Sequence, residues 1–279
     1  FEVFPPHGKT PLVKIKQTLE ELEDIHPDFI SVTLGAGGTG KRDSTVEIAD
    51  LIQNDLHIPA VAHIPGLYQS KKDVQGLLDQ FAAHHVTNIM ALRGDRVPGH
   101  EPVGDFDHAD DLVKFIKQNG DFDVIGACYP QCHQEAKDIA TDIRFLKQKV
   151  DCGTEHLISQ LFFDNQCFYD FTKQARQADI IVPIEAGIMP VTNQKQIARI
   201  ADISGTPLPE KFLTIMNRYV DNPEAMRDAG IAYAIDQIVD LVAHGVDGVH
   251  LYTMNYSQVA QRIWAATKTL FEASTTKPV

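Results

Sequence analysis

The feature of this sequence that most limits its fold is an alternation, along the whole chain, of short apolar or β-branched runs with longer stretches of helical periodicity. Parallel strands need a long crossover connection, usually a helix, so this alternation predicts βα units on a parallel sheet. The predicted strands are residues 1–4, 29–33, 60–63, 88–92, 124–129, 157–162, 180–184 and 248–252.

Helices are expected between these strands and after the last one. Apolar residues recur there at spacings of three and four, which is typical of helices with one buried face. The predicted helices are residues 11–22, 44–54, 71–84, 109–118, 135–150, 169–177, 194–201, 225–242 and 257–271. About eight strands, each followed by a helix, in 279 residues predict the α/β class and a (β/α)8 TIM barrel.

An open doubly wound sheet is the main alternative fold. Such a sheet usually carries a glycine-rich phosphate loop after its first strand, whereas residues 5–8 read Pro-Pro-His-Gly. A glycine cluster at residues 35–40 lacks the Gly-Lys-Ser/Thr ending of a P-loop. We interpret it as a loop after the second strand that could place Lys41 and Arg42 near an anion.

A single domain is expected over residues 1–279, because no linker rich in Pro, Gly or Ser divides the chain. Residues 205–222, with Pro207 and Pro209 before a short apolar stretch, are expected to form an insertion ahead of the long helix that precedes the eighth strand. The chain begins at Phe1 rather than Met, so we expect further residues to precede it.

The charge balance argues against several classes of partner. The formal net charge is −13, so no excess of Lys and Arg exists to neutralise the phosphates of nucleic acid or an anionic membrane surface. No apolar run approaches the roughly 18 residues of a membrane span, and the N-terminus has no charged and then apolar leader. We therefore expect a cytoplasmic protein that binds a small molecule.

The four cysteines fit a reducing compartment. They show no Cys-x-x-Cys spacing. Cys128, Cys132 and His133 are close enough to raise the question of a zinc site, but no convincing second pair of ligands accompanies them. We interpret Cys128, Cys132, Cys152 and Cys167 as reduced thiols and expect no metal.

An Arg-Gly-Asp turn marks the end of the fourth predicted strand. The apolar run of residues 88–92 stops at Arg93, Gly94 and Asp95. The carboxyl ends of barrel strands converge on one mouth, where the active site lies, so Asp95 is a candidate functional residue. The alternatives are a surface ion pair or a cap for the next helix.

Polar residues recur at the other predicted strand ends, which favours the functional interpretation. Glu2 lies within the first strand, where burial would be costly for its charge but would suit it to release a proton near neutral pH. A solvated terminal residue is the alternative for Glu2, and a structural hydrogen bond is the alternative for Gln160 in the sixth strand. The other candidates at strand ends are Thr33, His63, Tyr129, Glu185, Tyr252 and Asn255.

A further cluster follows the fifth strand. Tyr129 and His133 lead into a predicted helix that carries Asp142 and Lys149. Together they could line a wall for an extended polar ligand. A solvated helix face is the alternative.

Taken together, these motifs resemble the methylenetetrahydrofolate reductase family, in its bacterial form that consists of the catalytic domain alone. The resemblance covers nearly the whole chain and depends on the order and spacing of the motifs. They lie at residues 1–6 (Phe-Glu-Val-Phe-Pro-Pro), 31–33 (Ser-Val-Thr), 91–95 (Ala-Leu-Arg-Gly-Asp), 129–137, 146–151, 160–164 (Gln-Leu-Phe-Phe-Asp), 187–191 and 252–255 (Tyr-Thr-Met-Asn).

The resemblance implies a homo-oligomeric barrel that binds FAD and uses NADH or NADPH to reduce 5,10-methylenetetrahydrofolate to 5-methyltetrahydrofolate, which supplies methyl groups for methionine synthesis. Glu2 matches the general acid that protonates the bridging nitrogen, so that the five-membered ring opens to an iminium ion. Asp95 matches the acid beside the flavin and the folate, where its charge would stabilise that cation.

The resemblance also assigns binding positions. Gln160 matches an amide that contacts folate and nicotinamide in turn, Gln196 matches another folate contact, and Thr33 matches a contact to the nicotinamide donor. The positions that match flavin contacts, in addition to Asp95, are Leu34, Ala36, His63, Arg93, Gly94, His108, Ala109, Tyr129, His133, Ala136, Asp142 and Lys149.

Three positions depart from the pattern of the family. His108 stands where relatives usually have Tyr. Tyr256 follows Asn255 where many relatives have Arg, so a salt bridge to the folate tail would have to come from elsewhere. Glu185 and Ala186 replace the more usual Ile-Pro, which adds a carboxylate with no assigned role.

Two other functions stay open. A flavin barrel of the proline dehydrogenase kind would need a basic clamp for an amino-acid carboxylate, and no obvious Arg pair follows the eighth strand. A flavin subunit of a larger methyl-transfer or electron-transfer complex is the second alternative. A purified protein that does not oxidise NAD(P)H alone would favour that subunit.

Overall fold

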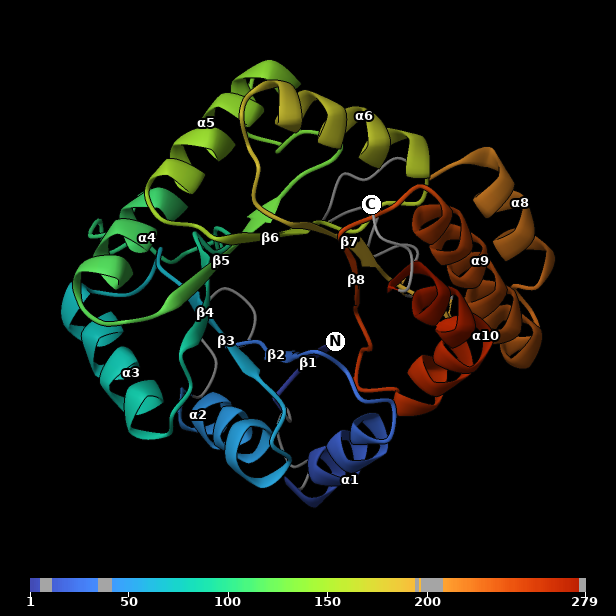
Figure 1. Ribbon diagram of the computed structural model, residues 1–279, viewed down its shortest axis with the longest axis horizontal. Helices are drawn as coiled ribbons and strands as arrows, with labels where there is room; N and C mark the ends of the chain where they lie inside the picture. The colour runs from blue at the N-terminus through green and yellow to red at the C-terminus, as the bar shows by residue number, and fades with distance from the viewer. Residues whose placement is uncertain (6–11, 35–41, 194–195, 197–207, 276–279) are drawn as a thin grey trace. The chain divides into compact units, whose positions relative to one another are not determined.

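Eight parallel strands, ordered β1 to β8 in the sheet as they are along the chain, alternate with helices in the computed structural model (Figure 1). The structure describes residues 1–5, 12–34, 42–193, 196 and 208–275. This is the predicted (β/α)8 barrel fold. The strands are β1 Glu2–Val3, β2 Ile30–Val32, β3 Ala60–Pro65, β4 Asn88–Leu92, β5 Asp123–Cys128, β6 His156–Ser159, β7 Ile184–Ile188 and β8 Gly248–Leu251.

The helices lie where the apolar periodicity predicts them, with shifts at some ends. α4 has the predicted limits, whereas α5 begins four residues later than expected and α6 begins four residues earlier, after Asp164, whose side chain accepts a hydrogen bond from Gln166 N at 3.0 Å. The helices are α1 Leu12–Glu23, α2 Arg42–Asp50 with the π-helical turn η2 Leu51–Asp55, α3 Lys71–Ala83, α4 Ala109–Gln118, α5 Ile139–Asp151, α6 Asn165–Gln177, α8 Glu210–Arg218, α9 Pro223–Ala243 and α10 Ser257–Thr275.

The seventh strand lies further along the chain than predicted. Residues 180–184 were expected to form it, but β7 starts only at Ile184. Arg176 Nη1 donates to the carbonyls of Ile180 (2.6 Å) and Val182 (2.8 Å), and the side chain of Ile181 is 84% exposed. The apolar run 180–182 therefore closes the end of α6, and the strand uses the more polar residues that follow.

The described residues of the predicted insertion include a helix. Residues 205–222 contain the helix α8. The helix expected at residues 194–201 lies outside the described residues apart from Gln196.

The chain divides into two compact units. The first comprises residues 1–127 and 145–157, and the second comprises residues 128–144 and 158–279. The single domain expected from the sequence stays a prediction.

In the first unit, β3 is buried along its whole length between β2 and β4. α3 begins at Ser70, whose hydroxyl accepts from Asp73 N while Asp73 Oδ2 accepts from Ser70 N, so two backbone N–H groups at the helix start are satisfied. The apolar face of this helix, with Leu77 and Phe81, is buried in the core. These contacts fix the strands whose carboxyl ends carry several predicted site residues.

In the second unit, α8, α9 and α10 lie side by side (Figure 1). An apolar cluster joins α8 and α9 to the segments that follow β6 and β7. α9 packs closely against the backbone of Val191 because Gly230 has no side chain. A Cβ at residue 230 would lie 1.7 Å from the carbonyl oxygen of Val191. The buried residues of the cluster are Leu161, Phe163, Val191, Phe212, Met216 and Met226.

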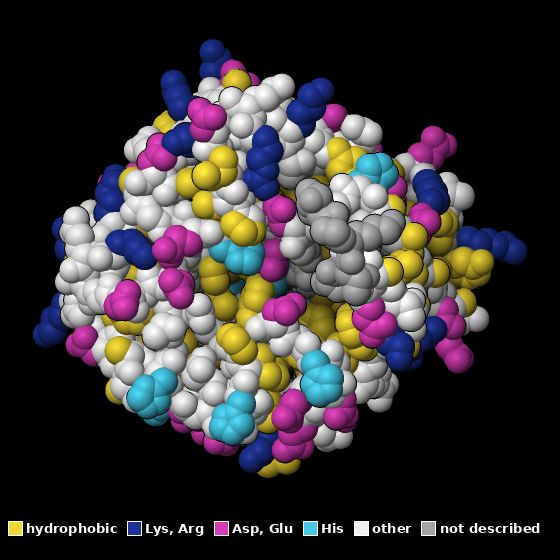
Figure 2. Space-filling model, in the orientation of Figure 1, with side chains coloured by type: hydrophobic (Ala, Val, Ile, Leu, Met, Phe, Trp, Pro, Cys, Tyr) yellow, Lys and Arg dark blue, Asp and Glu magenta, His cyan; other side chains and the backbone are white. Residues whose placement is uncertain are grey.

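On the face drawn in Figure 2, Lys and Arg side chains of the described residues are interspersed with Asp and Glu. Among the described residues, no helix has the length and hydropathy to cross a membrane.

Candidate active site

Glu2 is a buried acid of the predicted site. It lies in β1, and its side chain is only 10% exposed. Burial raises the pKa of the Glu2 carboxyl from its ordinary 4.5 to about 7, because the charged form loses its hydration. The alternative interpretation of Glu2 as a solvated terminal residue is therefore wrong.

His63 lies beside this acid. Its Nε2 is 3.7 Å from Glu2 Oε2, and its side chain is 6% exposed. The strand register explains the encounter: Glu2 pairs with Ser31, Ser31 pairs with Val61, and His63 is two residues further along β3 on the same face. The site thus contains a buried acid beside a buried imidazole.

Thr33 and Leu34 directly follow β2. The Thr33 carbonyl accepts a hydrogen bond from Thr45 Oγ1 at 3.0 Å. Its own Oγ1 is buried and has no hydrogen-bond partner among the described residues. Leu34 is buried, and the predicted flavin contact Ala36 lies outside the described residues. Thr33 therefore offers an unused hydroxyl at a strand end.

The Arg-Gly-Asp turn follows β4. Gly94 has φ +91°, a conformation that side chains rarely adopt, and a Cβ there would lie 3.1 Å from Pro65 Cβ. Arg93 Nε donates to the Gly94 carbonyl at 3.3 Å. Asp95 is exposed and forms no ion pair with any described residue, and α4 begins only at Ala109. Asp95 therefore does not cap α4, and no ion pair joins it to a described residue.

His108 and Ala109 mark the start of α4. His108 is the N-cap residue, and its backbone N–H donates to Asp111 Oδ2 at 3.1 Å. Ala109 is the first helical residue. The helix start thereby fixes both predicted flavin contacts.

Lys149 belongs to the first unit and is tied to a strand end. Its Nζ donates to the carbonyl of Ala127, near the carboxyl end of β5. The ammonium group is thus held near the level at which β5 ends, so the alternative of a purely solvated lysine is wrong.

In the second unit, residues 129–136 fold tightly on themselves. The rings of Tyr129 and His133 meet edge to face with centroids 4.6 Å apart, and Ala136 N donates to the His133 carbonyl at 2.9 Å. His133 N donates to Asp142 Oδ2 at 2.8 Å. Asp142 therefore anchors this segment to α5 and is not merely part of a solvated face.

Gln160 directly follows β6. Its Oε1 accepts a hydrogen bond from the backbone N of Leu161 at 2.9 Å, and its own backbone N donates to the Cys128 carbonyl at 2.7 Å. Because a backbone N–H can only donate, the amide oxygen must face Leu161 and Nε2 must point away. No described residue accepts a bond from Nε2, so Gln160 presents a donor to a ligand.

The two remaining folate candidates differ in their surroundings. Gln196 Oε1 accepts from the backbone N atoms of Thr192 (2.8 Å) and Asn193 (3.2 Å), so this oxygen stabilises the local turn. Tyr256 is 54% exposed and precedes α10. Its exposed ring would be accessible to a ligand.

A second buried acid–imidazole pair was not foreseen. Glu185 lies within β7 rather than after it, and its Oε2 is 3.6 Å from Nδ1 of His250 in β8. Polar residues within predicted strands were the available signal, but the partner follows only from the register of the two strands.

Among the described residues, no group of three or more His, Cys, Asp or Glu side chains is placed to hold a metal ion. All four cysteines are free thiols.

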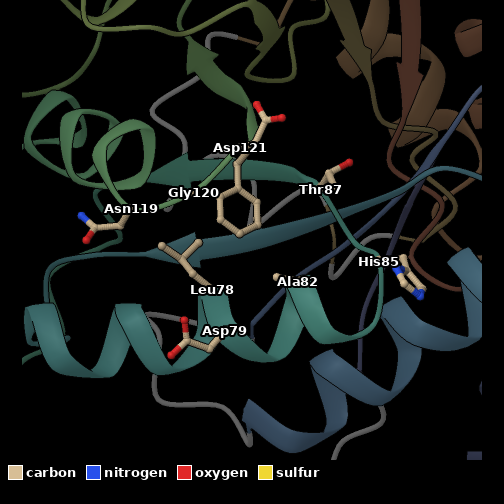
Figure 3. A pocket seen from close by; sticks show the side chains of 9 residues that line it. Leu78, Asp79, Ala82, His85, Thr87, Asn119, Gly120 and Asp121 are labelled. Atoms are coloured by element: carbon tan, nitrogen blue, oxygen red, sulfur yellow. The ribbon is translucent and has the colours of Figure 1, made fainter.

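A pocket of about 300 Å³ lies at the other end of the strands in the first unit (Figure 3). Leu78 and Ala82 of α3 line it, together with Thr87 before β4 and Asp121 before β5. None of the predicted site residues belongs to it.

The fold and this set of polar groups at strand ends define the chain as a barrel enzyme. Its sequence matches the family model "Methylenetetrahydrofolate reductase" over residues 1–268. The chain therefore belongs to the methylenetetrahydrofolate reductase family and is an oxidoreductase. This membership favours folate reduction over the proline dehydrogenase alternative.

Individual relatives agree with the family. The chain is 32% identical over 263 residues to the 5,10-methylenetetrahydrofolate reductase of Escherichia coli (strain K12), covering 94% of this chain and 88% of that protein. It is 33% identical over 275 residues to methylenetetrahydrofolate reductase (NADH) 1 of Arabidopsis thaliana, of which it spans 46%.

A solved structure has the same fold. It is that of an uncharacterized protein from Clostridium thermocellum that binds two copies of 5-methyl-5,6,7,8-tetrahydrofolic acid. The TM-score is 0.68 at 14% identity, over 98% of this chain and 94% of that one.

Proposed function

We propose that this enzyme reduces 5,10-methylenetetrahydrofolate to 5-methyltetrahydrofolate with NADH or NADPH, and that FAD carries the electrons. The observation that carries the proposal is the buried carboxyl group of Glu2, whose pKa of about 7 leaves much of it protonated at neutral pH. Ring opening of the substrate requires an acid of this kind.

Glu2 supplies the proton. Its neutral carboxyl donates to the bridging nitrogen of the folate, and the ring opens to an iminium ion. The low exposure of Glu2 and His63 keeps bulk water from competing for this proton. A bound FAD would supply the hydride-transfer chemistry that connects the nicotinamide to the iminium carbon.

Asp95 stabilises the cation. Its carboxylate is exposed and has no ion-pair partner among the described residues, so its negative charge is available to a ligand. A fixed negative charge lowers the free energy of the iminium ion relative to the neutral folate.

Gln160 orients the two substrates. Its Nε2 donates to an acceptor such as a carbonyl oxygen, and both the pterin and the nicotinamide carboxamide carry one. The same donor can serve each substrate in turn because nicotinamide and folate react in separate halves of the cycle.

The residues present suit FAD. Arg93 and Lys149 offer cationic donors for a pyrophosphate or a ring carbonyl. Thr33 offers a buried hydroxyl without a partner among the described residues, which suits a contact to the nicotinamide donor. We propose that Thr33 contacts the nicotinamide donor and that the flavin is bound by Leu34, Ala36, His63, Arg93, Gly94, Asp95, His108, Ala109, Tyr129, His133, Ala136, Asp142 and Lys149. Folate recognition is assigned to Asp95, Gln160, Gln196 and Tyr256.

Half-reactions test the function. The purified protein is expected to be yellow, to be bleached by NADH or NADPH, and to regain its flavin absorbance when methylenetetrahydrofolate is added. Reoxidation by menadione but not by the folate would contradict the proposed substrate. A protein that does not oxidise NAD(P)H alone would favour a subunit of a larger complex.

We also propose that the enzyme works in the cytoplasm as a homo-oligomer. Analytical ultracentrifugation of the flavin-loaded protein tests the second expectation, and a single monomer boundary would contradict it.

A further inference from the structure

Glu185 is a carboxyl group inside the fold that the proposed reaction does not use. It is the second residue of β7, and its side chain is only 13% exposed. Removing a carboxylate from water is unfavourable unless a partner compensates for the lost hydration. We therefore expect a neighbouring residue to compensate for the lost hydration of Glu185.

Its partner is His250 of the neighbouring strand β8. Nδ1 of His250 lies 3.6 Å from Glu185 Oε2, and the imidazole is 1% exposed. Residue Gly248, opposite Glu185 in the register, makes room for the acid, because a Cβ there would lie 2.9 Å from Glu185 Cγ. The distance of 3.6 Å between Nδ1 and Oε2 is longer than a hydrogen bond, but a negative charge beside Nδ1 favours a proton on that nitrogen and the ring orientation that turns it toward the carboxylate.

His250 in turn contacts Tyr252. The two rings meet edge to face with centroids 5.5 Å apart. The phenol lies over Gly187, where a Cβ would come within 2.9 Å of the phenolic oxygen, and this oxygen donates to the carbonyl of Ser159 at 2.8 Å. The orientation of His250 therefore restricts the ring that holds Ser159.

Ser159 is bound on both of its polar groups and precedes Gln160. Its hydroxyl accepts from Gly187 N at 2.9 Å and donates to the Gln160 carbonyl at 3.0 Å. With the Ser159 carbonyl held by Tyr252, the backbone that carries Gln160 is fixed from β7 and β8. A contiguous set of contacts thus leads from Glu185 to the backbone carbonyl of Gln160.

We propose that Glu185 and His250 are positioning residues that orient Gln160 through Tyr252 and Ser159. The pair keeps the ring of Tyr252 in place, and the fixed backbone directs Nε2 of Gln160 toward its ligand. An apolar residue at 185 would fill the space but would remove the negative charge beside Nδ1 of His250. The inference deepens the proposed function and rests on it, because that function makes Gln160 a ligand-binding residue.

A double-mutant cycle on the flavin-loaded enzyme tests this inference, with the KM for methylenetetrahydrofolate as the main readout. Glu185→Ile should raise this KM by about tenfold while kcat falls less than threefold, and Glu185→Gln, which keeps an acceptor, should raise it by about threefold. In a Gln160→Ala background, Glu185→Ile should change the KM by less than twofold, because there is no longer an amide to orient. The exposed Glu47→Gln in α2 is the matched control and should behave as the wild type.

The outcomes separate this inference from the proposed function. If Gln160→Ala raises the KM but Glu185→Ile multiplies it by the same factor in both backgrounds, the positioning role is refuted and the function stands. If Gln160→Ala leaves the KM unchanged, the assignment of Gln160 fails and this inference fails with it. Should Glu185→Ile not fold, Tyr252→Phe is the substitute, because it removes only the hydroxyl that holds Ser159. Tyr252→Phe should raise the KM for methylenetetrahydrofolate in the wild type, and this increase should disappear in the Gln160→Ala background.

Discussion

Oε2 of Glu2 lies 3.7 Å from Nε2 of His63, and both side chains are largely removed from solvent. The distance exceeds that of a normal hydrogen bond, so the two groups are neighbours that a ligand or a water molecule could still join. Because burial raises its pKa to about 7, the carboxyl group stays largely protonated up to near neutral pH. This combination suits an acid that must give up its proton once in each turnover.

Glu2→Gln is expected to separate the two half-reactions. Flavin reduction by the nicotinamide should stay within about threefold of the wild type, whereas reoxidation by methylenetetrahydrofolate should slow by about a hundredfold or more, since only the folate half needs the proton. Stopped-flow absorbance of the flavin measures both. An equal loss in the two halves would refute the role of Glu2 as the acid.

The raised pKa of Glu2 also predicts a pH-dependent stability. The folded chain keeps a proton on Glu2 up to about pH 7, whereas the unfolded chain releases it near pH 4.5, so this stabilisation is complete below pH 4.5 and is lost as the pH rises through 7. Between pH 5 and pH 8.5, the free energy of unfolding of the wild type should fall relative to that of Glu2→Gln by roughly 3 kcal/mol. Urea unfolding across this range measures the difference, and parallel curves would contradict the prediction.

Much of the fold follows from local pattern. β4 and α4 have the predicted limits, because the alternation of an apolar run with an amphipathic stretch is clear there. The seventh strand was misplaced because Ile180 and its neighbours are apolar without being a strand. Their carbonyls bind the side chain of Arg176, an interaction between side chain and backbone that strand propensity does not encode.

The site was predictable where a single residue carries the signal. A carboxyl between apolar residues in the first strand indicates the burial of Glu2, and the Arg-Gly-Asp turn does end a strand as expected. The pairing of Glu2 with His63 and of Glu185 with His250 was not predictable. Each depends on which residues share a face of the sheet, and the strand register decides that.

Asp95→Asn removes a negative charge without changing the size of the side chain. The folate half-reaction should slow by about tenfold, because the iminium ion loses its electrostatic stabilisation, whereas Asp107→Asn, an exposed neighbour in the same connection, should have no effect. Single-turnover reoxidation of the reduced enzyme by methylenetetrahydrofolate gives both rates. A wild-type rate for Asp95→Asn would show that its charge does not contribute.

Gly230→Ala is expected to destabilise the second unit. The new Cβ would lie 1.7 Å from the carbonyl oxygen of Val191 and 2.7 Å from its carbonyl carbon, and backbone atoms cannot move aside as a flexible side chain can. We expect a loss of about 3 kcal/mol in the free energy of unfolding. Gly76→Ala in α3 is the matched control, since no atom lies within 4 Å of its Cβ position, and there the better helix former should stabilise by about 0.5–1 kcal/mol. Helix propensity favours Ala at both positions. If urea unfolding shows that the free energy of unfolding falls for Gly230→Ala and rises for Gly76→Ala, the difference comes from the clash with Val191. Two stabilising substitutions would show that α9 does not pack against residue 191 as closely as the structure has it.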